Sequence, residues 1–213
     1  MVRWLRRHSG QRTERLRHMS EALTNYPPYM PPAWNPGITS IHDASAEYRR
    51  FFFANREGRI DALRMFLGTF NVVLNFDDNG VMAVSAWCPH YADALVEEMD
   101  TDGVRNAYDS FAAPWAGSLI GLNVIFDLGI YYGECLLARN PKLTWQPVRG
   151  PEPNNVAHPI FGQKSRRLSD PIKDAYRICC NIYNERKISV PPSAKISTKE
   201  DNLYHYILAR ANS

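Results

Sequence analysis

The feature that most constrains this fold is the apolar stretch from Ala116 to Ala138, which as a helix is long enough to cross a bilayer. Asp127 and Glu134 interrupt the stretch, and a carboxylate at the centre of a membrane costs ~2.5–3.5 kcal/mol. Lysine and arginine do not cluster on one flank, as they do beside an oriented span. We therefore predict a central, buried helix in a globular protein, and we expect no membrane span.

Glycine recurs at four-residue spacing along the same stretch, at Gly117 and Gly121 and again at Gly129 and Gly133. Small residues at this spacing let a neighbouring backbone approach closely. We expect the predicted helix to be closely packed on these glycines.

A narrow polar stripe follows one face of the predicted helix, because Asn123, Asp127, Tyr131 and Glu134 are spaced by four, four and three residues. Two interpretations stay open: a thin window on solvent, or the wall of a polar pocket. In a pocket the carboxylates need positive partners, since buried charges are normally paired, and we expect those partners between residues 149 and 167. The candidate binding residues are Asn123, Asp127, Tyr131, Glu134, Trp145, Arg149, Arg166 and Arg167.

The two carboxylates of the stripe also allow an alternative hypothesis, an enzyme of unfamiliar type. Asp127 and Glu134 are seven residues apart, or ~10.5 Å along a helix axis. Their side chains could approach to the ~6.5–9.5 Å that separates the acid and base of an inverting glycosidase. Structural helices often contain two acids at this spacing, so we assign no catalytic residue.

Other sites of known chemistry are not indicated. No HExxH, P-loop or GxGxxG motif occurs, and the four cysteines form no CxxC pair, so we expect neither a metal nor a cofactor. The loop 75–80 has the polar spacing of a calcium loop, but Ala86 stands where a carboxylate is required. We expect instead a polar turn that caps the next helix. The cysteines lie in apolar segments, and no signal peptide is visible, which favours free thiols in the cytoplasm.

The chain divides into three regions. We interpret residues 1–24 as a basic, flexible tail, residues 25–42 as an extended arm rich in proline and aromatic residues, and residues 43–213 as one globular domain.

The first 19 residues carry a charge of +5 and the whole chain +3, so the rest is slightly negative. Met19 is an alternative start. The basic tail suggests a second alternative, contact with nucleic-acid phosphates, through Arg3, Arg6, Arg7, Arg12, Arg15 and Arg17.

The predicted fold class is α+β and predominantly helical. Apolar spacing and capping signals predict helices over residues 45–55, 59–70, 80–99, 115–139, 171–186 and 198–210. Two short runs, 143–148 and 156–161, are typical of strands joined by the loop 149–155. We therefore expect one small antiparallel hairpin or sheet beside the central helix.

Three short segments together resemble a loose pattern found in small bacterial proteins of no established activity: Leu74-Asn75-Phe76-Asp77, Leu128-Gly129-Ile130-Tyr131-Tyr132-Gly133-Glu134, and Trp145 at the start of a strand. Asn75 stands where the pattern has aspartate. The resemblance implies a bacterial, cytosolic origin and no activity.

The leading hypothesis is a non-catalytic bacterial domain that binds a protein partner, for example an immunity or accessory factor. It follows from the missing catalytic motifs and from the many aromatic and arginine residues, which interfaces favour. The identity of the partner and the oligomeric state stay open.

Overall fold

The computed structural model describes residues 2–32, 40–146, 160–163 and 166–187, together with His205, Ile207 and Ala209. For residues 2–12 and for the second and third strands it describes the backbone alone. The helices are α1 (Val2–Thr24), α2 (Ile41–Gly68), α3 (Asp78–Tyr91), η1 (Ala92–Ala94), α4 (Asp102–Asp109), η2 (Gly117–Leu119), α5 (Gly121–Arg139) and α6 (Pro171–Lys187). The prediction of a mainly helical protein is confirmed. Of the predicted helix 198–210, only three helical residues are described, and the others lie outside the described residues.

The strands are β1 (Thr144–Gln146), β2 (Ile160–Gln163) and β3 (Arg166–Ser169). β1 pairs antiparallel with β2, with Trp145 opposite Phe161, and β2 pairs antiparallel with β3. The predicted loop 149–155 lies outside the described residues. β3 was not expected from the sequence, because its arginines gave no strand signal.

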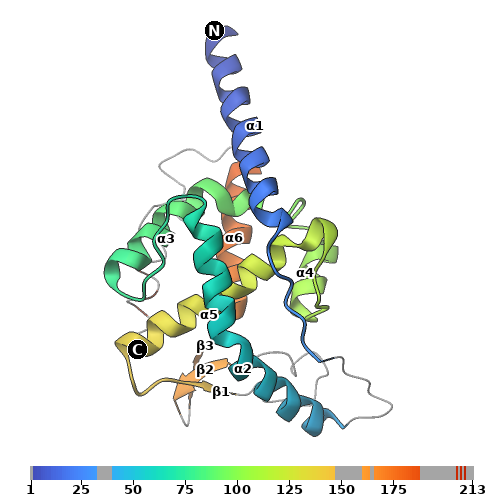
Figure 1. Cartoon of the computed structure of the whole chain (residues 1–213), viewed down its shortest axis with the longest axis vertical. Coiled ribbons are helices and arrows are strands. Elements are labelled where there is room, and N and C mark those ends of the chain that lie inside the picture. The colour runs from blue at the N-terminus through green and yellow to red at the C-terminus, as the bar shows by residue number, and fades with distance from the viewer. Residues whose placement is uncertain are drawn as a thin grey trace.

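Helix α5 occupies the centre of the protein and packs against α2 and α6 (Figure 1). Every residue from Gly121 to Gly133 is buried, which confirms the predicted central helix. The segment Gly117–Arg139 is the one described helix that is long and apolar enough to span a membrane, and 83% of its most apolar window is buried inside the protein.

The glycines of this segment allow close contacts with three different elements. A Cβ on Gly121 would lie 1.9 Å from the Leu95 carbonyl oxygen, and one on Gly133 would lie 2.1 Å from the Trp145 ring. At Gly129 the nearest atom would be the Cα of Ile172 in α6, at 2.6 Å. Gly117 differs, because it has open space around it and a left-handed φ of +58°.

Helix α2 is continuous from residue 41 to residue 68, so the prediction of two helices, 45–55 and 59–70, is wrong. The sequence Arg56-Glu57-Gly58 suggested a break, since glycine costs about 1 kcal/mol in a helix interior. Contacts on both sides of Gly58, of Arg56 with Glu134 and of Arg59 with Asp127, hold the continuous helix against α5. Ser40 caps the helix by accepting a hydrogen bond from the Asp43 amide at 3.1 Å.

Helix α3 begins at the polar turn 75–80, whose polar spacing is like that of a calcium loop. The Asp77 carboxylate accepts a hydrogen bond from the Gly80 amide at 2.8 Å, which confirms the capping role expected for this turn. The helix ends at Tyr91, well before the predicted residue 99. Its last carbonyls, of Pro89 and His90, accept hydrogen bonds from Arg186 and Arg15.

Helix α1 replaces the tail expected at the N-terminus. Residues 2–24 form one continuous helix, whose first turns extend beyond the rest of the protein (Figure 1). Its last turns pack on the core, where Met19 and Leu23 are buried. The tail prediction missed this packing because Met19 and Leu23 are four residues apart, a single turn of apolar face.

A substitution pair tests how α1 is attached. Arg15 donates two hydrogen bonds of 3.0 Å to the half-buried Asp93 carboxylate, whereas Arg17 pairs with exposed Glu14 and Glu21. We expect Arg15→Gln to lower the free energy of unfolding by ~1–2 kcal/mol, because hydrogen bonds to charged groups are strong. Arg17→Gln should leave it nearly unchanged. Equal losses in urea denaturation would contradict this attachment.

The arm, described here for residues 25–32, enters the core. Tyr26 and Tyr29 are 4% and 2% exposed, so the arm packs into the core rather than along the surface. Residues 33–39, including Trp34, lie outside the described residues.

Candidate functional site

The polar stripe of α5 faces other parts of the protein rather than solvent. Asn123, Asp127 and Tyr131 are completely buried, and Glu134 is largely buried. Each side chain of the stripe has a hydrogen-bond or ion-pair partner within the protein, so the solvent-window interpretation is wrong.

Asp127 is the centre of the stripe and is bound by an arginine of α2. The Nε of Arg59 donates to both carboxylate oxygens, at 2.9 and 3.1 Å, and its Nη2 donates to Oδ2 at 2.6 Å. The Tyr26 hydroxyl of the arm also donates to Oδ2. The carboxylate therefore accepts several strong hydrogen bonds, most of them from one guanidinium.

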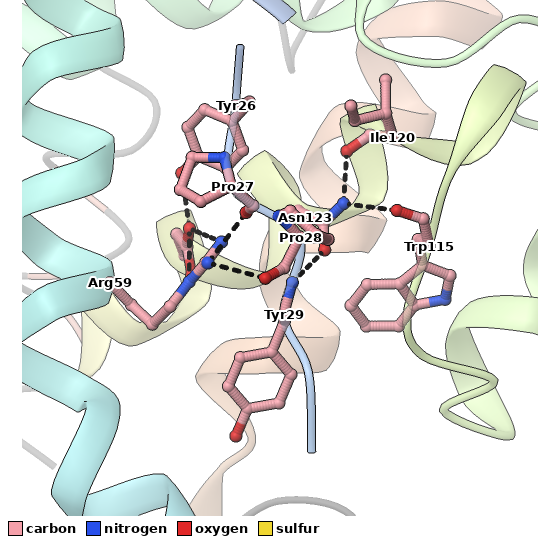
Figure 2. Close-up of polar contacts among 9 residues, drawn as sticks. Tyr26, Pro27, Pro28, Tyr29, Arg59, Trp115, Ile120 and Asn123 are labelled. Atoms are coloured by element: carbon pink, nitrogen blue, oxygen red, sulfur yellow. Dashed lines mark hydrogen bonds and ion pairs between the residues drawn. The ribbon is translucent and has the colours of Figure 1, made fainter. Parts of the chain in front are cut away.

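Arg59 also holds the backbone of the arm. Its Nη1 donates to the carbonyls of Pro27 and Pro28, at 2.8 and 3.3 Å (Figure 2). The guanidinium carbon lies 5.5 Å from the Tyr26 ring centroid and 5.8 Å from that of Tyr29. One guanidinium thus joins α2, α5 and the arm, and it uses planar fork geometry that lysine could not reproduce.

Asn123 attaches the arm one turn earlier on α5. Its Oδ1 accepts a hydrogen bond from the Tyr29 amide at 2.8 Å. Its Nδ2 donates to the carbonyls of Trp115 and Ile120, at 2.9 and 2.8 Å (Figure 2). Both amide protons are used, so Asn123 has no donor left for a ligand.

The other half of the stripe is also occupied by the fold. Tyr131 donates to the Asn75 carbonyl at 2.7 Å and stacks on Phe76. Glu134 accepts a hydrogen bond from the Trp145 indole at 2.9 Å and forms an ion pair with Arg56 at 3.3 Å. Trp145, predicted as a binding residue, contacts the stripe as a structural partner.

The electrostatics of Asp127 follow from its burial. Burial raises the pKa of Asp127 to about 6, although the Arg59 guanidinium and the Tyr26 hydroxyl both lower it. Burial and the adjacent carboxylate raise the pKa of Tyr26 well above its ordinary value. At neutral pH the network therefore consists of an arginine cation, a carboxylate and a neutral phenol that donates its proton.

The basic partners come from a different part of the chain than predicted. Arg56 and Arg59 of α2 pair with Glu134 and Asp127, whereas Arg149 lies outside the described residues. Arg166 and Arg167 form part of β3, and their side chains are not described.

A signal for the arginines of α2 was present in the sequence. Phe52, Arg56, Arg59, Leu63 and Phe66 follow the four-and-three spacing of one buried helix face. Two arginines on an otherwise apolar face indicate buried acidic partners. The predicted break between residues 55 and 59 concealed this pattern, because it split the face between two helices.

The chemistry open to this network is limited. Asp127 has no contact with solvent and is surrounded by donors that belong to the protein, so a substrate has no route to it in this arrangement. Among the described residues, no group of three or more histidine, cysteine, aspartate or glutamate side chains could hold a metal ion. The described part of the stripe is a structural network.

The alternative sites on α1 are partly used as well, since Arg15 and Arg17 have carboxylate partners within the protein. The side chains of Arg3, Arg6, Arg7 and Arg12 are not described. Comparison with known proteins gives no relative: no family model, no curated protein and no solved structure matches the chain.

Proposed function

We propose that this protein is a non-catalytic, protein-binding domain of the bacterial cytoplasm, such as an immunity or accessory factor. The observation that supports this proposal most is a group of arginine and aromatic side chains on α2, of which Arg49, Arg50 and Phe53 are exposed. We call it the α2 cluster and define it as Arg49, Arg50, Phe53 and Arg56.

The α2 cluster is centred on a phenylalanine. Phe53 is 38% exposed, and the guanidinium carbons of Arg49 and Arg56 lie 5.7 and 5.4 Å from its ring centroid. Arg50 is exposed one turn before Phe53. Arginine and aromatic residues are enriched at protein interfaces and in their energetic hot spots, which favours docking at this position.

The position of the cluster on α2 also supports docking. The neighbouring, buried face of the same helix is fixed by Phe52 packing on Trp145, by Arg56 pairing with Glu134 and by Arg59 binding Asp127. A rigid helix presents its exposed side chains in one geometry, so little conformational entropy is lost when a partner binds.

The enzyme alternative is less well supported, because its two carboxylates are bound by Arg59 and Arg56. An acid–base pair must exchange protons with a substrate at hydrogen-bond distance. In this fold the donors of α2 and of the arm occupy that distance around Asp127.

Affinity capture with a matched pair of variants tests the proposal. The wild-type protein and Phe53→Ser are used to capture proteins from bacterial lysate, with Met65→Ser as control on the same helix. Met65 is 70% exposed, so it can be exchanged without affecting the core. We expect at least one protein to be retained by the wild type and the control, and to be reduced about 30-fold by Phe53→Ser, as for a hot-spot residue. Identical capture by all three proteins would contradict docking at the α2 cluster.

A further inference from the structure

The partner of the α2 cluster can be described by its charge, an inference that rests on the proposed function. Arg49 and Arg50 are exposed. Among the arginines whose side chains the structure describes, these two form no salt bridge, whereas every other one pairs with an aspartate or glutamate. Within the described side chains, the other arginines are thus paired, and two adjacent cations remain beside one exposed aromatic ring.

We propose that the α2 cluster binds an acidic protein segment, which places carboxylates on Arg49 and Arg50 and an apolar side chain on Phe53. Arginine binds carboxylates through two parallel hydrogen bonds, a geometry that fixes the orientation of the partner as well as attracting it. The apolar contact on Phe53 excludes water from the centre of the site, which strengthens both ion pairs at its edge.

The neighbouring charges favour a protein carboxylate over the phosphates of a nucleic acid. Glu57 is exposed one turn after Phe53, and Arg56 is already bound to Glu134. A nucleic acid carries a phosphate at every nucleotide, so it would place several negative charges near Glu57 and Glu134, which would repel them. An acidic protein segment can carry two carboxylates at the required spacing and apolar residues beside them.

The probe for this proposal is a short helical peptide with a central leucine and a glutamate one turn away on each side. Binding to the full-length protein is followed by NMR through the backbone amides of residues 49–56. We expect the matched glutamine peptide to bind about fivefold more weakly, since each exposed ion pair contributes modestly. The double variant Arg49→Gln/Arg50→Gln should lower the affinity for the glutamate peptide by the same factor. Raising the salt concentration should lower this affinity further.

The control variant is Arg64→Gln, which removes an exposed arginine from the same helix that already pairs with Asp61. It should leave peptide binding unchanged. Phe53→Ser should abolish binding of both the glutamate and the glutamine peptide, because it removes the apolar contact.

The outcomes separate this inference from the proposed function. If Phe53→Ser abolishes binding but Arg49→Gln/Arg50→Gln does not change it, docking stands and the acidic partner is wrong. If the peptides bind elsewhere and capture is insensitive to Phe53, both proposals fail. A duplex DNA probe that binds more tightly than the peptide, and depends on Arg49 and Arg50, would overturn the acidic protein segment in favour of a nucleic acid.

Discussion

Replacing Arg59 with methionine is expected to lower the free energy of unfolding by ~3–5 kcal/mol, the range typical of removing one member of a buried ion pair. Methionine fills a similar volume, but it leaves the Asp127 carboxylate without a counter-charge and the carbonyls of Pro27 and Pro28 without their donor. Urea denaturation monitored by circular dichroism measures the loss. Arg64→Met on the exposed side of the same helix is the control and should have almost no effect.

The free energy of unfolding lost in Arg59→Met should increase with pH. The pKa of Asp127 is about 6 in the folded protein, above ~3.9 in an unfolded chain, so its contribution to stability is complete at low pH and is lost as pH rises through the folded value. Arg59 lowers this pKa, and removing it raises the pKa further. The deficit of Arg59→Met should therefore grow from about pH 5 to about pH 8.

A double variant shows whether Asp127 is the cause. In Arg59→Met/Asp127→Asn no ionisable group remains in the pair, so the added pH dependence should disappear and part of the stability should return. A deficit that is the same at all pH values, or unchanged by the second substitution, would contradict the network.

Gly129→Ala should also destabilise the protein strongly, by ~1–3 kcal/mol or more, as overpacked cores do. The added Cβ would lie 2.6 Å from the Cα of Ile172 and 3.0 Å from the carbonyl oxygen of Pro171. Both are backbone atoms at the start of α6, so no side-chain rotation can relieve the clash, and α6 must move away from α5.

Gly58→Ala is the matched control, because this glycine lies inside α2 with open space around its Cα. Alanine should stabilise the helix by ~0.5–1 kcal/mol, since glycine loses more backbone entropy on folding. The same chemical change is thus expected to have opposite signs at two helical positions. Thermal melts of both variants check this, and equal signs would mean that α5 and α6 do not meet at Gly129.

The sequence was informative where the signal is local and incomplete where it depends on distant residues. The apolar residues of α5 recur over its whole length, so the helix, its burial and its polar stripe could be predicted. The partner of Asp127 could not, because Arg59 lies 68 residues earlier in the chain. Helical periodicity shows which side chains share a face, but not which helix that face will meet.

The arm shows the same limit. Proline correctly indicated that it is extended, since the ring fixes φ and removes a donor. Its burial in the core depends on Tyr26, whose hydroxyl binds Asp127, and on Tyr29, whose amide binds Asn123. No local sequence pattern indicates these partners on α5. The α2 cluster was missed for another reason. Phe53 follows the partly buried Phe51 and the buried Phe52, and only the three-dimensional packing shows that Phe53 is the exposed one.

The docking of the arm has a consequence for synthesis on the ribosome. Tyr26 precedes Asp127 by 101 residues and Tyr29 precedes Asn123 by 94. At ~5–20 residues per second, the arm is made roughly 5–20 s before its partners on α5 exist. Throughout that interval Asp127 and Asn123 are missing as partners, and the prolines keep the segment from joining a helix started by α1. One of the first segments to be translated is therefore one of the last to reach its native position.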